Sequence, residues 1–308
     1  MRPSTKARLL ALGLAGALAA AGCSSNSDSP TPSAAPNTAT PAASATPITG
    51  RYVAMGSSFA AGTGIGADIS TGCLRSARNY PHLLASRLHL DLVDVTCGGA
   101  TVQNLLSTPQ GDHPVQIAGL TADTRLVTIT AGGNDLAYSL STLICANAAG
   151  TGKPCTSLPT PQDTKTAAAK LRTTFTALFA AIKAKAPQAR IYLVTYPRVF
   201  PDPPKTCPGN VISTADSVTL AGIGATLQNT SRLAATDAHI TLIDAYTASA
   251  EHDVCAPAAD RWIDGSNATG TPYHPNATGT AALSTLIATA LTHPTSQPTV
   301  PQATASHG

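Results

Sequence analysis

Short β-prone runs alternate with helical patterns along the chain, and this alternation limits the possible folds more than any other feature. The expected strands are residues 52–55, 92–95, 126–129, 191–194 and 240–243. Apolar residues at helical spacing predict helices over residues 171–182, 220–227 and 283–291, and Ser213 with Asp216 resembles a capping box before the second of them. Strands separated by helices form βαβ units, so the sequence predicts an α/β fold, a three-layer α/β/α sandwich around a parallel five-stranded sheet. Ligands of such sheets bind beyond the carboxyl ends of the strands.

The amino-terminal segment has the pattern of an export signal. Residues 1–22 combine a basic start with the apolar run 9–18, which is shorter than the roughly 20 residues of a membrane span. The segment ends Ala-Ala-Gly-Cys, which resembles a bacterial lipobox and predicts lipidation of Cys23. The alternative is an ordinary secreted protein, cleaved at an Ala-x-Ala-like site, in which Cys23 has no role.

Composition divides the rest of the chain into three parts. Residues 23–48 are rich in Ser, Thr, Pro and Ala, which predicts a disordered tether, and residues 293–308 predict a disordered tail. Residues 49–292 are expected to form one domain. Removing the leader with its three basic residues from the 19 in the chain leaves 16, which equals the 16 acidic residues. A neutral domain has no electrostatic footprint for nucleic acid, so nucleic-acid binding is excluded as a function.

Six cysteines remain after Cys23, an even number that predicts three disulfides in an exported chain. Sequential pairing is expected, because each such pair brackets a loop-rich stretch between predicted core elements. The expected pairs are Cys73–Cys97, Cys145–Cys155 and Cys207–Cys255. The chain has no Cys-x-x-Cys motif, which argues against a zinc site and against thiol–disulfide catalysis.

Groups suited to acyl chemistry follow several of the predicted strands. Ser57 and Ser58 come directly after the first strand between small residues, where a nucleophilic hydroxyl is accessible. Two glycines (98 and 99) follow the second strand, and Gly-Gly-Asn-Asp (132–135) follows the third. His274, next to a proline and before the last helix, is a candidate general base. Each feature alone also fits a turn or a helix cap, whereas the four together favour a hydrolase.

One competing pattern lies in the same region. Gly62, Gly64 and Ala67 fit the dinucleotide fingerprint Gly-x-Gly-x-x-Ala. They start too far beyond the strand for that motif, and an exported protein meets little NAD. We therefore expect no cofactor. The histidines and acidic residues also form no spacing typical of a metal site.

The order Gly-x-Ser, Gly-Ala, Gly-x-Asn-Asp and His-Pro resembles the SGNH (GDSL-type) hydrolase family over nearly all of residues 51–290. The flanking sequences 55–62, 79–81 and 95–97 are similar to its secreted actinobacterial branch of esterases, lipases and phospholipases. The resemblance implies a flavodoxin-like sandwich and sequential disulfides. It implies Ser58 as nucleophile and His274 as base, with an oxyanion hole formed by the Ser58 N–H, the Gly99 N–H and the Asn134 side-chain amide.

The chain departs from the family pattern at two positions. Ser57 stands at the position of the aspartate in the Gly-Asp-Ser-Leu motif after which the GDSL family is named. That aspartate is not a member of the catalytic triad. Thr271 stands where the family has the acid of the triad, three residues before the histidine. Some relatives orient the imidazole with a backbone carbonyl from that position, so the resemblance implies that the Thr271 carbonyl orients His274. The alternative is that Asp264 or Asp253 folds back to supply a carboxylate.

These features predict an extracytoplasmic serine esterase or lipase that hydrolyses carboxylic esters through an acyl-enzyme on Ser58. The protein is expected to be a monomer, anchored through Cys23 on the outer face of the cytoplasmic membrane. One alternative stays within acyl chemistry: a phospholipase, or a deacetylase of cell-envelope carbohydrate. A second alternative, suggested by the missing acid at Thr271, is an envelope-binding lipoprotein without catalysis.

Overall fold

The computed structural model describes residues 47–70, 72–156 and 158–292. The predicted signal peptide, the lipidation site at Cys23, the tether up to residue 46 and the tail from residue 293 lie outside the described residues. Within the described ranges, no helix has both the length and the apolar character needed to cross a membrane.

The centre of the fold is a parallel five-stranded sheet, as the sequence predicted. Its strands are β1 (Arg51–Gly56), β2 (Asp91–Asp94), β3 (Leu126–Thr130), β4 (Arg190–Val194) and β5 (Thr241–Ile243). Their order is β2-β1-β3-β4-β5 and every neighbouring pair is parallel. This is the flavodoxin-like order, in which the switch point lies between β1 and β3.

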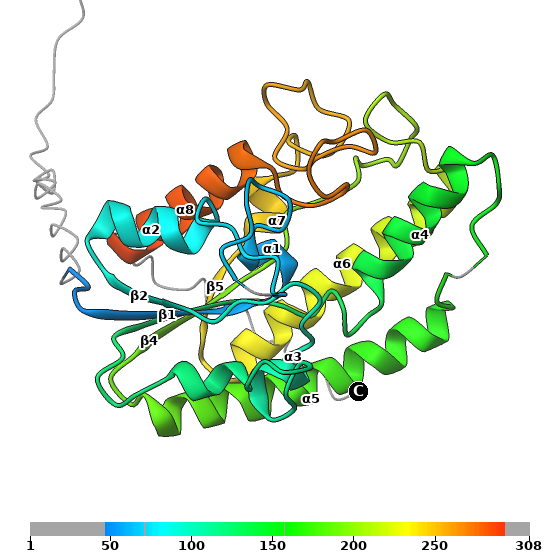
Figure 1. Cartoon of the computed structure of the whole chain (residues 1–308). Helices are drawn as coiled ribbons and strands as arrows, with labels where there is room; N and C mark the ends of the chain where they lie inside the picture. Colours follow the sequence, from blue (N-terminus) through cyan, green and yellow to red (C-terminus); the bar gives the residue numbers. More distant parts are fainter. Residues whose placement is uncertain (1–46, 71, 157, 293–308) are drawn as a thin grey trace, which may run out of the picture. The chain divides into compact units, whose positions relative to one another are not determined.

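Helices cover both faces of the sheet (Figure 1). One face carries α2 (Tyr80–Leu88) and α8 (Ala277–Thr292), and the other carries α3 (Val102–Leu106), α5 (Pro161–Lys185) and α6 (Thr214–Asp237). The remaining helices are α1 (Ser58–Ala61), the 3₁₀ helix η1 (Gln116–Gly119), α4 (Tyr138–Gly150) and α7 (Ala245–Ala248). The predicted three-layer α/β/α sandwich is therefore confirmed.

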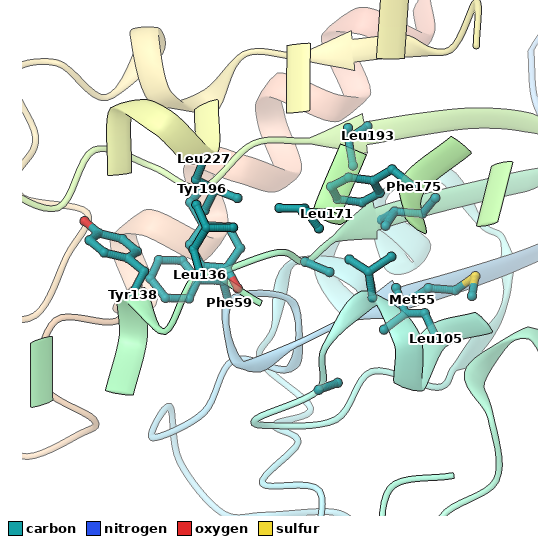
Figure 2. Close-up of a cluster of buried hydrophobic side chains, with 14 of the residues drawn as sticks. Met55, Phe59, Leu105, Leu136, Tyr138, Leu171, Phe175, Leu193, Tyr196 and Leu227 are labelled. Carbon is teal, nitrogen blue, oxygen red and sulfur yellow. The ribbon is translucent and has the colours of Figure 1, made fainter. Parts of the chain in front are cut away.

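The core lies in two layers because side chains of a strand alternate between the faces of the sheet. In β1, Val53 and Met55 join the cluster under α3, α5 and α6, whereas Tyr52 and Ala54 join the cluster under α2 and α8. Figure 2 shows part of the first cluster, with Met55 close to side chains of α3 and α5. All five residues of β3 are buried, including Thr128 and Thr130, whose hydroxyls pair with those of Tyr52 at 2.7 Å and Tyr80 at 2.9 Å.

The three predicted helices correspond to parts of α5, α6 and α8. The predicted cap is also present, because the Ser213 hydroxyl accepts the Asp216 N–H at 3.1 Å at the start of α6. Helix α4 was not predicted. Its apolar residues are not gathered on one face, since Leu140 and Ile144 are exposed while Ser141 and Thr142 are buried, so the sequence lacks the periodicity that marks an amphipathic helix.

The three disulfides have the predicted sequential pairing. Cys73–Cys97 joins the loops after β1 and β2, Cys145–Cys155 joins the middle of α4 to the loop that follows this helix, and Cys207–Cys255 joins the loops after β4 and β5. The first and third bridges tie together loops at the carboxyl edge of the sheet, where the candidate residues lie.

Candidate active site

Ser58 is the first residue of α1, at the carboxyl end of β1. The turn before it depends on Gly56, whose φ of +147° favours glycine. A Cβ at Gly56 would lie 2.3 Å from the carbonyl oxygen of Thr130 on the neighbouring strand β3. Only glycine therefore allows the backbone to pass close enough to β3 and turn directly into the helix that presents Ser58.

His274 meets Ser58 from the far end of the chain. It lies three residues before α8, and its Nε2 is 2.9 Å from the Ser58 hydroxyl oxygen. Both residues are buried, with 6% of Ser58 and 4% of His274 exposed. The Phe59 ring lies 4.9 Å from the imidazole, centroid to centroid, and stacks on Tyr196 at 3.9 Å (Figure 2). The imidazole thus has an aromatic wall and limited contact with water.

The group that orients the imidazole is the carbonyl of Pro272, and the expectation for Thr271 is wrong. His274 Nδ1 lies 2.9 Å from the Pro272 oxygen, whereas the Thr271 oxygen accepts the backbone N–H of His274 at 3.3 Å. Thr271 is the first residue of a turn completed by Tyr273 in a left-handed conformation (φ +58°). Because that turn already uses the Thr271 carbonyl, the next carbonyl is the one that faces the ring.

Neither carboxylate that the sequence offered as an alternative bonds the imidazole. Asp264 contacts the histidine segment through its backbone, whose N–H donates to the carbonyl of His274 at 2.8 Å. One carboxylate oxygen of Asp253 accepts the Cys255 N–H at 2.7 Å. Across the described ranges, no acidic side chain is hydrogen-bonded to His274.

Burial and the Pro272 bond together define the state of the imidazole. Desolvation lowers the pKa of His274 below its ordinary value of 6.5, and the bond to the Pro272 carbonyl opposes this more weakly. A carbonyl only accepts, so Nδ1 must carry the proton and Nε2 must be the acceptor. Near pH 7 the neutral imidazole therefore presents a lone pair to the Ser58 O–H.

Amide donors lie on the loops around Ser58. The Ser58 N–H is in the first turn of α1, where N–H groups have no partner within the helix. The loop after β2 carries Gly99 and is bonded to the turn before Ser58, because the Cys97 N–H donates to the Gly56 carbonyl at 3.0 Å. Asn134, directly after β3, donates one N–H to the Ala100 carbonyl at 2.9 Å and retains a second.

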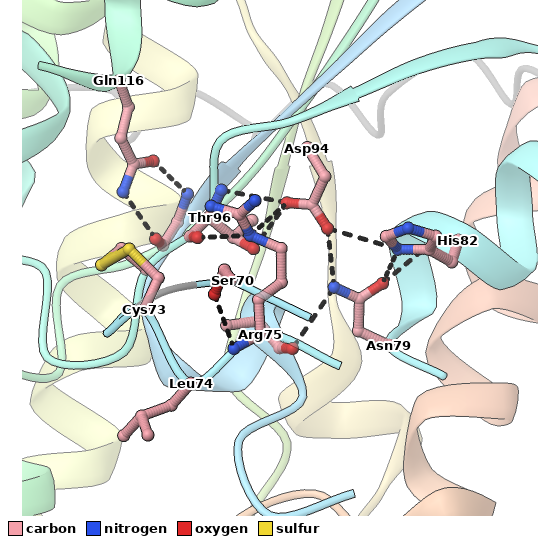
Figure 3. Close-up of polar contacts among 12 residues, drawn as sticks. Ser70, Cys73, Leu74, Arg75, Asn79, His82, Asp94, Thr96 and Gln116 are labelled. Carbon is pink, nitrogen blue, oxygen red and sulfur yellow. Dashed lines mark hydrogen bonds and ion pairs between the residues drawn. A yellow bond between two sulfur atoms is a disulfide. The ribbon is translucent and has the colours of Figure 1, made fainter. Parts of the chain in front are cut away.

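A polar network fixes the loop after β1 against the loop after β2 (Figure 3). Asp94, at the end of β2, accepts hydrogen bonds from the Asn79 amide at 2.8 Å and the Thr96 hydroxyl at 2.6 Å. Its carboxylate also lies 3.5 Å from Nε of Arg75, which donates to the Thr96 carbonyl at 2.8 Å. The side chain of Asp94 is only 6% exposed, so these contacts are weakly screened by solvent.

Two supporting residues were missed by the sequence analysis. Gln116 accepts the Gly56 N–H at 2.7 Å and donates to the Gly56 carbonyl at 2.9 Å, which clamps the backbone two residues before Ser58 (Figure 3). Tyr196 hydrogen-bonds the buried hydroxyl of Ser57, the residue at the family's aspartate position. Neither contact leaves a periodic signal in the sequence. Asp135, next to Asn134, ties its loop to the start of α3 by accepting the Val102 N–H at 3.0 Å.

One group of metal-ligating residue types occurs in the described ranges, formed by Cys73, Cys97 and His113. Its two sulfurs are joined in a disulfide, so they are not thiolate ligands. The group does not fit a metal site in this oxidised form.

Comparisons with known proteins identify the family of the chain. A model of the GDSL-like Lipase/Acylhydrolase family matches residues 54–282. Lipase 2 of Streptomyces coelicolor is 31% identical over 243 residues, covering 74% of this chain and 81% of that protein.

Solved structures extend the likeness to three dimensions. The extracellular lipase of Streptomyces rimosus is 25% identical with a TM-score of 0.61, covering 78% of this chain and 99% of that one. Phospholipase A1 of Streptomyces albidoflavus NA297 has the same identity and TM-score, over 77% of this chain and 97% of that one. This chain therefore belongs to the GDSL-like lipase/acylhydrolase family and is a carboxylic ester hydrolase.

Proposed function

We propose that the protein is an extracytoplasmic serine esterase or lipase in which Ser58 and His274 form a catalytic dyad. The single observation that carries the proposal is the 2.9 Å hydrogen bond between the Ser58 hydroxyl and His274 Nε2. A nucleophile within hydrogen-bond reach of a base, itself oriented by a third group, is the arrangement that activates a serine. Here the third group is the Pro272 carbonyl.

The reaction proceeds in two halves. Ser58 Oγ attacks the ester carbonyl carbon while His274 Nε2 takes the hydroxyl proton, and the carbonyl oxygen becomes an oxyanion. The Ser58 N–H, the Gly99 N–H and the second N–H of Asn134 donate to that oxyanion. As the C–O bond to the alcohol breaks, the imidazolium returns the proton to the leaving oxygen, and an acyl-enzyme remains. In the second half, water attacks the acyl carbon while His274 Nε2 takes its proton. The bond from the acyl carbon to Ser58 Oγ then breaks, the imidazolium returns the proton to Oγ, and the acid is released.

The Pro272 carbonyl performs the essential work of a third triad member. That work is to hold the tautomer and the orientation of the imidazole, and the third group is not itself protonated. A carbonyl carries only a partial negative charge and stabilises the imidazolium less than a carboxylate does. Burial lowers the pKa of His274 below its ordinary value of 6.5, so the imidazole is unprotonated near neutral pH and its Nε2 can accept the Ser58 proton.

The substrate class is a lipid-type carboxylic ester. The support comes from the family and from relatives described as lipases and as a phospholipase A1. The purified protein should therefore hydrolyse p-nitrophenyl acyl esters, and phospholipid esters are the natural second class to assay.

The dyad can be tested on the unmodified protein with a fluorophosphonate. We expect one label per chain, attached to Ser58 and located by peptide mass spectrometry. Because the imidazolium cannot accept a proton, the labelling rate should fall as pH decreases through the pKa of His274. Burial lowers that pKa, so the midpoint should lie below 6.5. Folded protein that takes up no label would instead support the envelope-binding lipoprotein without catalysis.

We also propose that the protein is exported and anchored through a lipid on Cys23. Three disulfides in the described domain support an oxidising compartment, and the S. rimosus relative is described as extracellular. The mature protein from membranes should begin at Cys23 with the added mass of a diacylglyceryl group. An unmodified mature terminus produced by cleavage elsewhere would contradict the anchor and leave the dyad unaffected.

A further inference from the structure

The loop that carries the Gly99 N–H contains two successive glycines, so its backbone alone does not fix the direction of this donor. Gly98 and Gly99 lack the side chains that restrict backbone rotation, and Gly99 has a left-handed φ of +79°. An oxyanion donor is effective only when its direction is set before the reaction. Some other group must therefore hold the peptide that joins Gly98 to Gly99.

The side chain of Gln110 is that group. Its Nε2 donates to the Gly98 carbonyl oxygen at 2.7 Å. Gln110 itself is fixed by a tight turn, because its backbone N–H and carbonyl both pair with those of His113 at 3.0 Å. The amide that reaches Gly98 thus starts from a rigid position.

The planarity of the peptide bond transmits this contact to the donor. The Gly98 carbonyl and the Gly99 N–H belong to one trans peptide unit and point in opposite directions. Fixing the oxygen on one side of the unit fixes the N–H on the other side. We propose that Gln110 is a positioning residue of the oxyanion hole, which orients the Gly99 N–H through the Gly98 carbonyl. This inference rests on the proposed function.

Two observations separate this role from general loop stability. The flanking peptides have other partners: the Gly98 N–H donates to the Cys73 carbonyl at 2.8 Å, and the Ala100 N–H donates to the Cys97 carbonyl at 3.2 Å. Loss of the Gln110 amide would therefore free one peptide unit and leave the loop attached. In addition, Oε1 of Gln110 is buried without a hydrogen-bond partner among the described residues, so only the N–H half of this amide is used.

The test compares two variants of the full chain, Gln110→Met and Gln110→Glu, with wild type on p-nitrophenyl butyrate. Methionine keeps the length of the side chain but has no donor. We expect kcat to fall roughly 10- to 100-fold with KM within about twofold, since removing an oxyanion donor outright costs ~10²–10³. Affinity for phenylboronic acid, whose tetrahedral adduct on Ser58 places an oxygen in the hole, should fall by a similar factor. Gln103→Glu, on the exposed side of α3, is the matched control and should behave as wild type.

The Gln110→Glu variant adds a second measurement, the pH dependence of kcat, which a purely structural role of Gln110 would not change. This measurement can be made even if the methionine variant does not fold. A protonated carboxyl can donate to the Gly98 carbonyl and an ionised one cannot. The kcat of this variant, divided by that of wild type at each pH, should therefore recover as pH decreases through the carboxyl pKa. A wild-type kcat for folded Gln110→Met, or a kcat ratio for Gln110→Glu that does not change with pH, would overturn the inference.

The proposed function fails separately. If the Ser58→Ala variant remained active, the proposed dyad would be wrong. If Ser58→Ala were inactive and Gln110→Met were fully active, only the role of Gln110 would be wrong.

Discussion

Ser58→Ala is expected to reduce kcat for ester hydrolysis by roughly 10⁴- to 10⁶-fold, because it removes the atom that forms the acyl-enzyme. The loss should appear in kcat on both p-nitrophenyl butyrate and phosphatidylcholine vesicles. Labelling by fluorophosphonate should disappear with it. The fold should remain intact, since the Ser58 hydroxyl contacts the His274 ring and the helix α1 keeps its backbone bonds.

The control for this variant is Ser107→Ala, an exposed serine at the end of α3. It should hydrolyse both substrates at the wild-type rate and take up one label. Circular dichroism and thermal unfolding of Ser58→Ala should match wild type. A folded Ser58→Ala that keeps even a tenth of the wild-type activity would show that another nucleophile performs the reaction.

His274→Ala is expected to lower kcat by roughly 10²- to 10⁴-fold, which is the usual contribution of a positioned general base. Without the imidazole, nothing at 2.9 Å from the Ser58 hydroxyl accepts its proton. The residual rate of the variant should rise with hydroxide concentration over the pH range in which the wild-type rate does not change with pH. Labelling by fluorophosphonate should slow by a comparable factor, because it uses the same deprotonation.

His89→Asn is a suitable control for the histidine, because His89 is exposed and has a left-handed φ of +54°, a conformation that asparagine tolerates. This variant should retain the wild-type rate and the wild-type pH profile. If His274→Ala preserved the acidic limb of that profile, the titrating group would have to be another residue and the dyad would be wrong.

Much of the architecture was predictable because it depends on local patterns. The β-prone runs and the helical spacings are properties of short segments, and their alternation leads to a parallel sheet through the handedness of βαβ connections. Ser58 was expected at the carboxyl edge of the sheet for the same reason, because it directly follows β1. Its pairing with His274, which lies just before α8, was expected from the family resemblance. Two of the sequential disulfides, Cys73–Cys97 and Cys207–Cys255, agree with this arrangement, since they join loops at that edge.

The contacts that orient the site were decided by the tertiary structure. Which carbonyl faces His274 depends on a turn with Tyr273 in a left-handed conformation. The carbonyl that orients the imidazole is therefore that of Pro272, one residue after the expected Thr271. The bonds of Gln116 to Gly56 and of Gln110 to Gly98 are made by long side chains from loops elsewhere in the chain. A polar side chain outside a regular element has no period that identifies its partner. Only the packing of the loops brings such donors and acceptors within hydrogen-bond distance.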